Sequence, residues 1–182
     1  MPVRAVRRRR LTKSAYTWLL SATTALVLST GLLTVSALGA GATPSCATSN
    51  LRLDLVPPIQ GATSHRYWDM TLRNVGSTTC HLRGFPGVGL LDSHARPIND
   101  NVNRQTGFPQ RNVVLRPWQP AWFTFGYVVA GPCLPHSFSA YGIEVFPPNS
   151  TSRLVYYRGR FDVCGPSLSH PVVYPVRPSR KL

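Results

Sequence analysis

Four cysteines are the residues of this sequence best suited to react with one another. They are Cys46, Cys80, Cys133 and Cys164, an even set. Cysteine ligands of zinc usually come in closely spaced pairs, often with paired histidines, and neither pattern is present. We therefore expect two disulfides and no metal site. Disulfides persist in oxidising compartments, so this expectation places the folded part of the chain outside the cytoplasm.

Histidines and carboxylates, the usual acid–base catalysts, form no recognisable catalytic motif here. The 182 residues include five histidines and six acidic residues. There is no H-E-x-x-H zinc motif, no G-x-S-x-G elbow and no glycine-rich phosphate loop. Asp54 and Asp69 fall at strand positions that should face solvent, so we interpret them as surface residues. We expect a protein that is not an enzyme and that uses no cofactor.

A second interpretation stays open, a small envelope hydrolase with a histidine-centred site. Catalytic triads are assembled in space rather than along the sequence. His65, His81 or His136 could therefore lie beside a carboxylate or a serine in the folded protein. Five histidines scattered over the structure would argue against this interpretation.

Aromatic residues close to arginines form the candidate binding surface. Aromatic rings can stack on sugars or bases, and guanidinium groups pair with anions. Trp118 is the strongest surface candidate because Pro117 and Pro120 hold it in a turn. The residues assigned to this surface are Trp118, Arg116, Trp122 and Arg158.

The net charge of the sequence indicates which kind of partner it favours. The sequence has 20 Lys+Arg against 6 Asp+Glu, a formal net charge of +14. A basic surface favours anionic partners, although it can equally serve solubility alone. We expect anionic cell-envelope components or an envelope protein as partners. Nucleic acid is not expected, because export separates the chain from it and no recognition motif is present.

Residues 1–42 resemble an export signal. A basic start is followed by an apolar run over about residues 15–38 and by small residues at positions 40–42. The apolar run approaches the ~20 residues that span a bilayer, so the segment is either cleaved as a signal peptide or kept as an anchor helix. Membrane contact is expected only through this segment, if it is uncleaved. The predicted location is extracytoplasmic, secreted or associated with the cell envelope.

The elements that must position these residues are strands. Leu51, Leu53 and Leu55 alternate with polar residues, and Trp68, Met70 and Leu72 do the same. This period of two predicts strands with one buried face, and 17 prolines suit turns and sheet edges. We predict an all-β, antiparallel immunoglobulin-like sandwich over residues 43–176, with Val172-Val173-Tyr174 as an edge strand and a basic tail over 177–182.

Strand order also predicts which cysteines pair. If segments 51–56 and 67–73 form an antiparallel pair, Cys46 and Cys80 flank adjacent strand ends. Cys133 precedes the strand at 139–146 and Cys164 follows the strand at 153–163, so these two also meet. We therefore pair Cys46 with Cys80 and Cys133 with Cys164.

The central stretch resembles a known family. Its pattern is Asn74-x-Gly76-x-x-x-Cys80-x-Leu82-x-Gly84-Phe85-Pro86-Gly87-Val88. Together with the other cysteines and Leu115-x-Pro117, it makes residues 46–176 similar to the bacterial domain of unknown function 4232 (DUF4232), found on exported proteins and lipoproteins of high-GC Gram-positive bacteria. The family usually has glycine where Trp118 stands. The resemblance implies a β-sandwich and export, and it implies no catalytic residue.

Overall fold

A computed structural model of the protein describes residues 42–61, 63–98, 101–165 and 167–181. The predicted signal or anchor segment, with its apolar helix, lies outside the described residues except for Ala42. Within the described ranges, no helix is long and apolar enough to cross a membrane. Two short 3₁₀ turns, η1 (Thr48–Asn50) and η2 (Gly131–Cys133), are the helical elements there.

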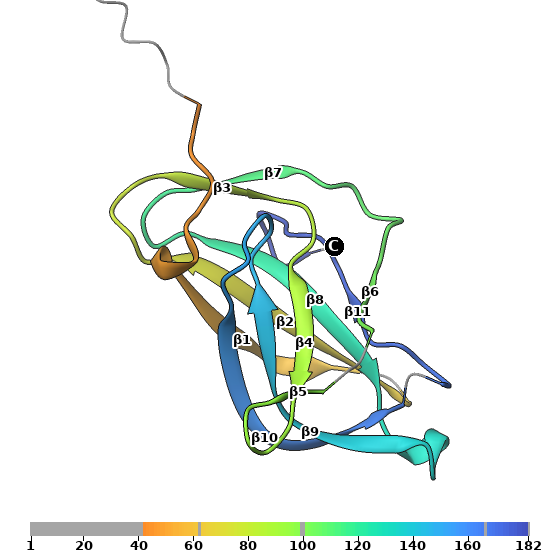
Figure 1. Ribbon diagram of the computed structural model, residues 1–182. Coiled ribbons are helices and arrows are strands. Elements are labelled where there is room, and N and C mark those ends of the chain that lie inside the picture. Colours follow the sequence, from red (N-terminus) through yellow and green to blue (C-terminus); the bar gives the residue numbers. More distant parts are fainter. Residues whose placement is uncertain (1–41, 62, 99–100, 166, 182) are drawn as a thin grey trace, which may run out of the picture. The chain divides into compact units, whose positions relative to one another are not determined.

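Strands dominate the described residues and form two main sheets and a ribbon (Figure 1). The first sheet has the order β1 (Leu51–Gln60), β2 (His65–Asn74), β8 (Pro120–Val128), β11 (Val172–Val173) and β6 (Asn103–Arg104). The second has the order β10 (Leu154–Cys164), β9 (Ser137–Phe146), β4 (Gly87–Leu91) and β5 (Pro97–Ile98). The ribbon pairs β3 (Cys80–Arg83) with β7 (Asn112–Leu115).

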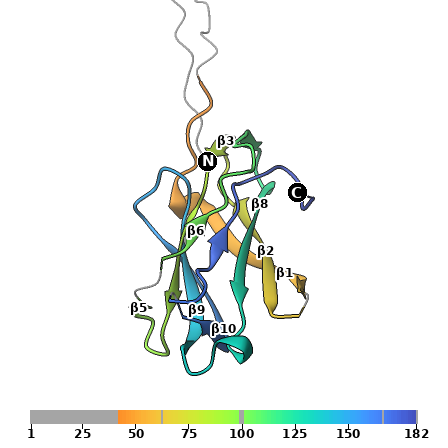
Figure 2. The same cartoon turned by 90° about the vertical axis from the view of Figure 1, so that its right-hand side faces the viewer.

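The long strands follow the immunoglobulin order. Strands β1, β2 and β8 correspond to A, B and E of that fold, and β4, β9 and β10 correspond to C, F and G. Figure 2 shows β1 and β2 on the right and β5 and β9 further left. Buried side chains of both sheets form one hydrophobic core. The prediction of an all-β sandwich is confirmed.

Alternation along β2 and β8 builds the core. Trp68, Met70 and Leu72 of β2 are fully buried, as the period-two pattern predicts. Phe123 and Phe125 lie beside them on the same face of the sheet, at alternate positions of the neighbouring strand β8, and are also fully buried. Each such side chain contributes ~1.5–3 kcal/mol through burial, so these buried side chains of β2 and β8 supply much of the hydrophobic stabilisation.

Both predicted disulfides are present. Cys46 and Cys80 are bonded across 34 residues, with 4.9 Å between their Cα atoms. Cys133 and Cys164 are bonded across 31 residues, with 5.4 Å between their Cα atoms. In the chain-entropy model, each loop closure contributes ~3–4 kcal/mol of stability. The predicted pairing is confirmed, and two disulfides are consistent with an extracytoplasmic location.

The C-terminal segment differs most from the sequence prediction. Val172–Val173 forms no edge strand, because β11 lies between β8 and β6 in the first sheet. The residues beyond it are not a free tail. Arg177 and Trp122 exchange two main-chain hydrogen bonds of 2.8 Å, so the chain continues along β8. This places the side chains of the last residues at the outer face of the sheet.

Candidate functional site

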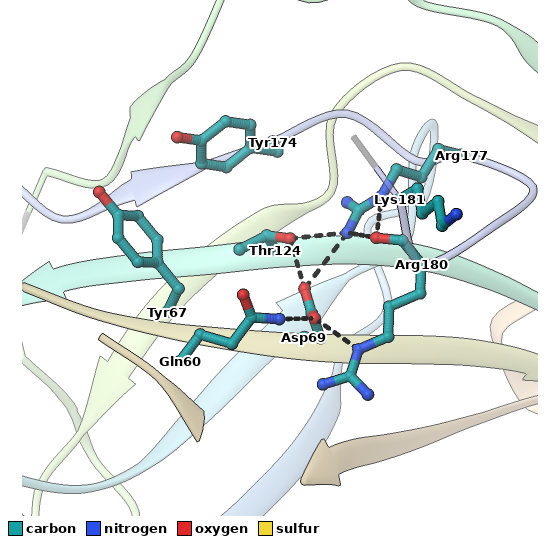
Figure 3. A pocket seen from close by; sticks show the side chains of 8 residues that line it. All are labelled: Gln60, Tyr67, Asp69, Thr124, Tyr174, Arg177, Arg180 and Lys181. Carbon is teal, nitrogen blue, oxygen red and sulfur yellow. Dashed lines mark hydrogen bonds and ion pairs between the residues drawn. The ribbon is translucent and has the colours of Figure 1, made fainter. Parts of the chain in front are cut away.

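A cleft of about 500 Å³ lies on the outer face of the first sheet (Figure 3). Strands β1, β2 and β8 supply its floor, and the segment after β11 supplies its basic wall. The cleft is lined by Gln60, Tyr67, Asp69, Thr124, Tyr174, Arg177, Arg180 and Lys181. Its lining joins charged and polar side chains with two tyrosine rings, so we take it as the candidate site.

Asp69 is the centre of a hydrogen-bond network at the cleft floor. Its Oδ1 accepts from Thr124 Oγ1 at 2.8 Å and from Arg177 Nη2 at 3.2 Å. Its Oδ2 accepts from Gln60 Nε2 at 2.9 Å and from Arg180 Nε at 2.9 Å. Figure 3 shows these four donors converging on one carboxylate. With two donors on each oxygen, this carboxylate is fully engaged and poorly placed to act as a base.

Burial of Asp69 and Arg177 affects the pKa of the Arg177 guanidinium. The side chains of Asp69 and Arg177 are only 6% and 11% exposed. Desolvation lowers the pKa of Arg177 from its ordinary value, and the neighbouring Asp69 carboxylate opposes that shift. A guanidinium pKa starts so high that Arg177 remains charged at neutral pH. Arg177 therefore keeps its positive charge beside the Asp69 carboxylate.

Cationic groups remain in excess after Asp69 is paired. Three lining residues are cationic, namely Arg177, Arg180 and Lys181, against one carboxylate. Arg177 Nη1 is buried and has no hydrogen-bond partner among the described residues. The surplus positive charge of the cleft therefore favours an anion.

Two tyrosines complete the site at the end away from Lys181. Tyr67 and Tyr174 lie together on one side of the carboxylate network in Figure 3. Burial raises the pKa of Tyr174, Tyr67 adds to the increase, and the charge of Arg177 opposes it. The Tyr174 hydroxyl is thus protonated at physiological pH and can donate a hydrogen bond to a ligand oxygen.

Three of the four residues predicted as a binding surface lie in or just before β8, and the fourth, Arg158, lies in β10 of the other sheet. Trp118 and Arg116 share the turn before β8, and Trp118 is 63% exposed with a positive φ of 68°. Trp122 lies on the outer face of β8, two residues before Thr124 of the cleft floor. Arg158 is in β10, with its Cζ 5.1 Å from the centre of the buried Trp68 ring. Arg158 thus packs against the core at another place.

Sequence reasoning missed the residues that form the cleft. Asp69 was assigned to the solvent-facing side of its strand, and the structure corrects this, because Asp69 is buried under Arg177 and Arg180. Glu144 of β9 is likewise a buried carboxylate, ion-paired with Arg153 on the second sheet. One signal was available, since aspartate is depleted in strand interiors and its presence there suggests a dedicated partner.

The histidines are mostly separate from one another. His81 Nδ1 lies 2.7 Å from the Thr43 main-chain oxygen, and His94 lies beside Ser93 on the surface. His65 and His170, by contrast, line one hollow together. Among the described residues no histidine forms an ion pair with a carboxylate, and no group of three or more His, Cys, Asp or Glu could hold a metal ion.

The fold and the cleft define a disulfide-linked, immunoglobulin-like β-sandwich with a basic hollow on one sheet. The sequence profile described as "Domain of unknown function (DUF4232)" matches residues 46–172. The chain therefore belongs to the DUF4232 family. No curated protein and no solved structure matches the chain.

Some residues that line the cleft lie within the range matched by the family profile, and the others follow it. Gln60, Tyr67, Asp69 and Thr124 lie within residues 46–172, whereas Tyr174 and the three cationic residues follow it. The floor of the cleft thus belongs to the family domain, and its basic wall comes from the segment after that domain.

Proposed function

We propose that this protein is a non-catalytic binding module of the cell envelope, whose cleft takes an anionic group of an envelope polymer, lipid or protein. The observation that carries the proposal is the paired state of Asp69. Because Arg177 and Arg180 already neutralise that carboxylate, the remaining positive charge of the wall is available to a ligand.

The proposed compartment rests on three features of the chain. The basic and apolar start of the sequence is typical of an export signal. Both disulfides favour an oxidising environment. The overall positive charge favours encounter with the anionic polymers and lipids of an envelope. Secretion and retention at the membrane are both compatible with these features.

The alternative, a small envelope hydrolase, has one observation in its favour. Ser169 lines the same hollow as His65 and His170. A histidine general base is normally oriented by a carboxylate, and no aspartate or glutamate lines this hollow among the described residues. Binding is therefore the better supported proposal.

Titration with inorganic phosphate tests the proposal. We expect the amide resonances of Thr124, Tyr174, Arg177, Arg180 and Lys181 to shift in a ¹H–¹⁵N spectrum, because these residues line the cleft. Lys181→Ala should weaken phosphate binding about threefold, since it removes an exposed cation of the wall. Raising the salt concentration about tenfold should weaken binding further, because screening is stronger.

Arg96→Ala is the matched control for charge. It also removes one arginine, but Arg96 is 73% exposed and is paired with Asp92 in the turn before β5. Phosphate affinity that drops equally in Arg96→Ala and Lys181→Ala would mean that net charge, and not the cleft, is responsible.

A further inference from the structure

A second hollow continues the cleft along the same face of the sheet. It has a volume of about 230 Å³ and contains His65 and His170. Tyr67 and Tyr174 line both this hollow and the basic cleft. The two hollows are therefore neighbouring parts of one groove, divided by a pair of tyrosines.

Strand register places the parts of this groove in a line. His65, Tyr67 and Asp69 occupy alternate positions of β2, so their side chains emerge on the same outer face. Across the ladder, Tyr67 is opposite Gly126 and Asp69 is opposite Thr124. Two residues of an antiparallel strand span about 7 Å, so about 14 Å separates the Asp69 level from the His65 level. That length exceeds a single small anion.

Gly126 keeps the middle of the groove flat. A Cβ atom at this position would lie 2.8 Å from Cδ1 and Cε1 of Tyr67 and 3.0 Å from Cγ2 of Val172. The Tyr67 ring thus rests directly on the β8 backbone, where only glycine leaves room for it. Its ring is also nearly parallel to that of His65, with 10° between the planes and 6.3 Å between the centres.

The chemistry changes along the groove in a defined order. Cations and hydrogen-bond donors stand at one end, aromatic faces stand in the middle, and two imidazoles stand at the other end. Aromatic faces favour the apolar faces of sugars and polyols, and imidazole nitrogens bond to hydroxyl or phosphate oxygens. A ligand that fills the groove must therefore carry an anionic group, then a hydroxylated unit, then a further polar group.

We propose that the groove binds a linear anionic polymer, spanning more than one repeat, in which charged groups alternate with polyol or sugar units. This inference rests on the proposed function and extends it, since it names the class of ligand and assigns His65 and His170 to its recognition. The charged group of one repeat binds beside Arg180 and Lys181. The next unit lies over Tyr67, and the following repeat reaches the histidines.

Ligand length is the variable that tests this inference. The probes are glycerol 1-phosphate and a chain of four glycerol phosphates joined by phosphodiesters, measured by calorimetry on the folded chain. We expect the tetramer to bind at least about tenfold more tightly than the monomer, because contacts beyond the tyrosines add to the phosphate contact. His65→Ala and His170→Ala should each weaken tetramer binding about threefold and leave monomer binding unchanged.

His94→Ala is the matched control, since His94 is exposed like His65 and His170 but lies in the turn after β4. Equal tetramer affinity in His65→Ala, His170→Ala and the control would overturn the extended groove, even if the tetramer binds tightly through its charge. In that case monomer binding that still depends on Lys181 would leave the proposed function standing. Failure of both probes to bind would instead reject the proposed function itself.

Discussion

Asp69 on β2 and Arg177 near the C-terminus form a buried ion pair across 108 residues of sequence, with 3.2 Å between Oδ1 and Nη2. The guanidinium reaches the carboxylate by crossing β8, and on the way it bonds to Thr124 Oγ1 at 2.8 Å. The pair therefore fixes the C-terminal segment to the outer face of the sheet. It acts together with the two main-chain hydrogen bonds between Arg177 and Trp122, which hold the same segment along β8.

Removing the carboxylate should destabilise the fold strongly. Asp69→Ala leaves the buried charge of Arg177 without its partner, which typically costs ~3–5 kcal/mol. We expect a loss of this size in the free energy of unfolding from urea denaturation. Asp54→Ala serves as the control, because Asp54 pairs with Arg52 and Arg73 at the surface, where such pairs contribute ~0–1 kcal/mol. Equal losses in the two variants would contradict the structural role of Asp69.

The same ion pair explains why the sequence predicted the fold better than the site. Alternation in β2 identifies which face of the strand is buried in the core, and Trp68 and Met70 obey it. The alternation does not indicate whether another segment of the chain covers the opposite face of the strand. Asp69 is covered by arginines 108 and 111 residues away, and no local pattern reports such a contact.

The Cys133–Cys164 disulfide, by contrast, was predictable because it depends on strands that are close in sequence. Cys133 and Cys164 flank β9 and β10, which are neighbours in sequence and pair directly as a hairpin. Arg158 could not be placed in this way, because the register of that hairpin shifts between Tyr157 and Phe161. A bulge reverses the alternation of faces, so the sequence alone does not tell which side Arg158 takes.

Trp118 should carry measurable backbone strain. Its φ of 68° is in the left-handed region, which costs a side chain with a Cβ roughly 1–2 kcal/mol and costs glycine little. We expect Trp118→Gly to be more stable than Trp118→Val by about that amount in thermal or urea denaturation, because valine is β-branched. Both variants remove the exposed indole, so the comparison isolates the backbone. A valine variant as stable as the glycine variant would show that this turn has another conformation in solution.

Alkaline pH should destabilise the protein through two tyrosines. Burial raises the pKa of Tyr127 and Tyr174 above the ordinary value of 10.0, and nearby arginines oppose both shifts. Since the folded state favours the neutral phenol, the stabilisation is complete below the unfolded pKa and is lost as pH rises through the higher folded pKa. We expect the free energy of unfolding to fall above about pH 10.

Tyrosine-to-phenylalanine variants test which tyrosines cause this loss of stability at alkaline pH. Tyr174→Phe removes a titrating group, so the drop between about pH 9 and pH 11 should be smaller than in the unchanged protein. Tyr157→Phe is the control, because the Tyr157 side chain is 54% exposed. A drop that is unaltered by Tyr174→Phe and by Tyr127→Phe would assign the alkaline transition to other groups.

Gly126 should couple the stability of the sheet to the shape of the groove. In Gly126→Ala the new methyl group would meet the Tyr67 ring at 2.8 Å, so the ring must leave the β8 backbone. We expect a loss of about 1–3 kcal/mol in urea denaturation, as for other overpacked sites. Gly107→Ala is the control, since nothing lies within 4 Å of a Cβ there.

Adding Tyr67→Ala to Gly126→Ala should recover most of the lost stability, because it removes the atoms that collide with the new methyl group. If the two changes are simply additive, Tyr67 does not rest on Gly126 in solution, and the flat middle of the groove is lost with that contact.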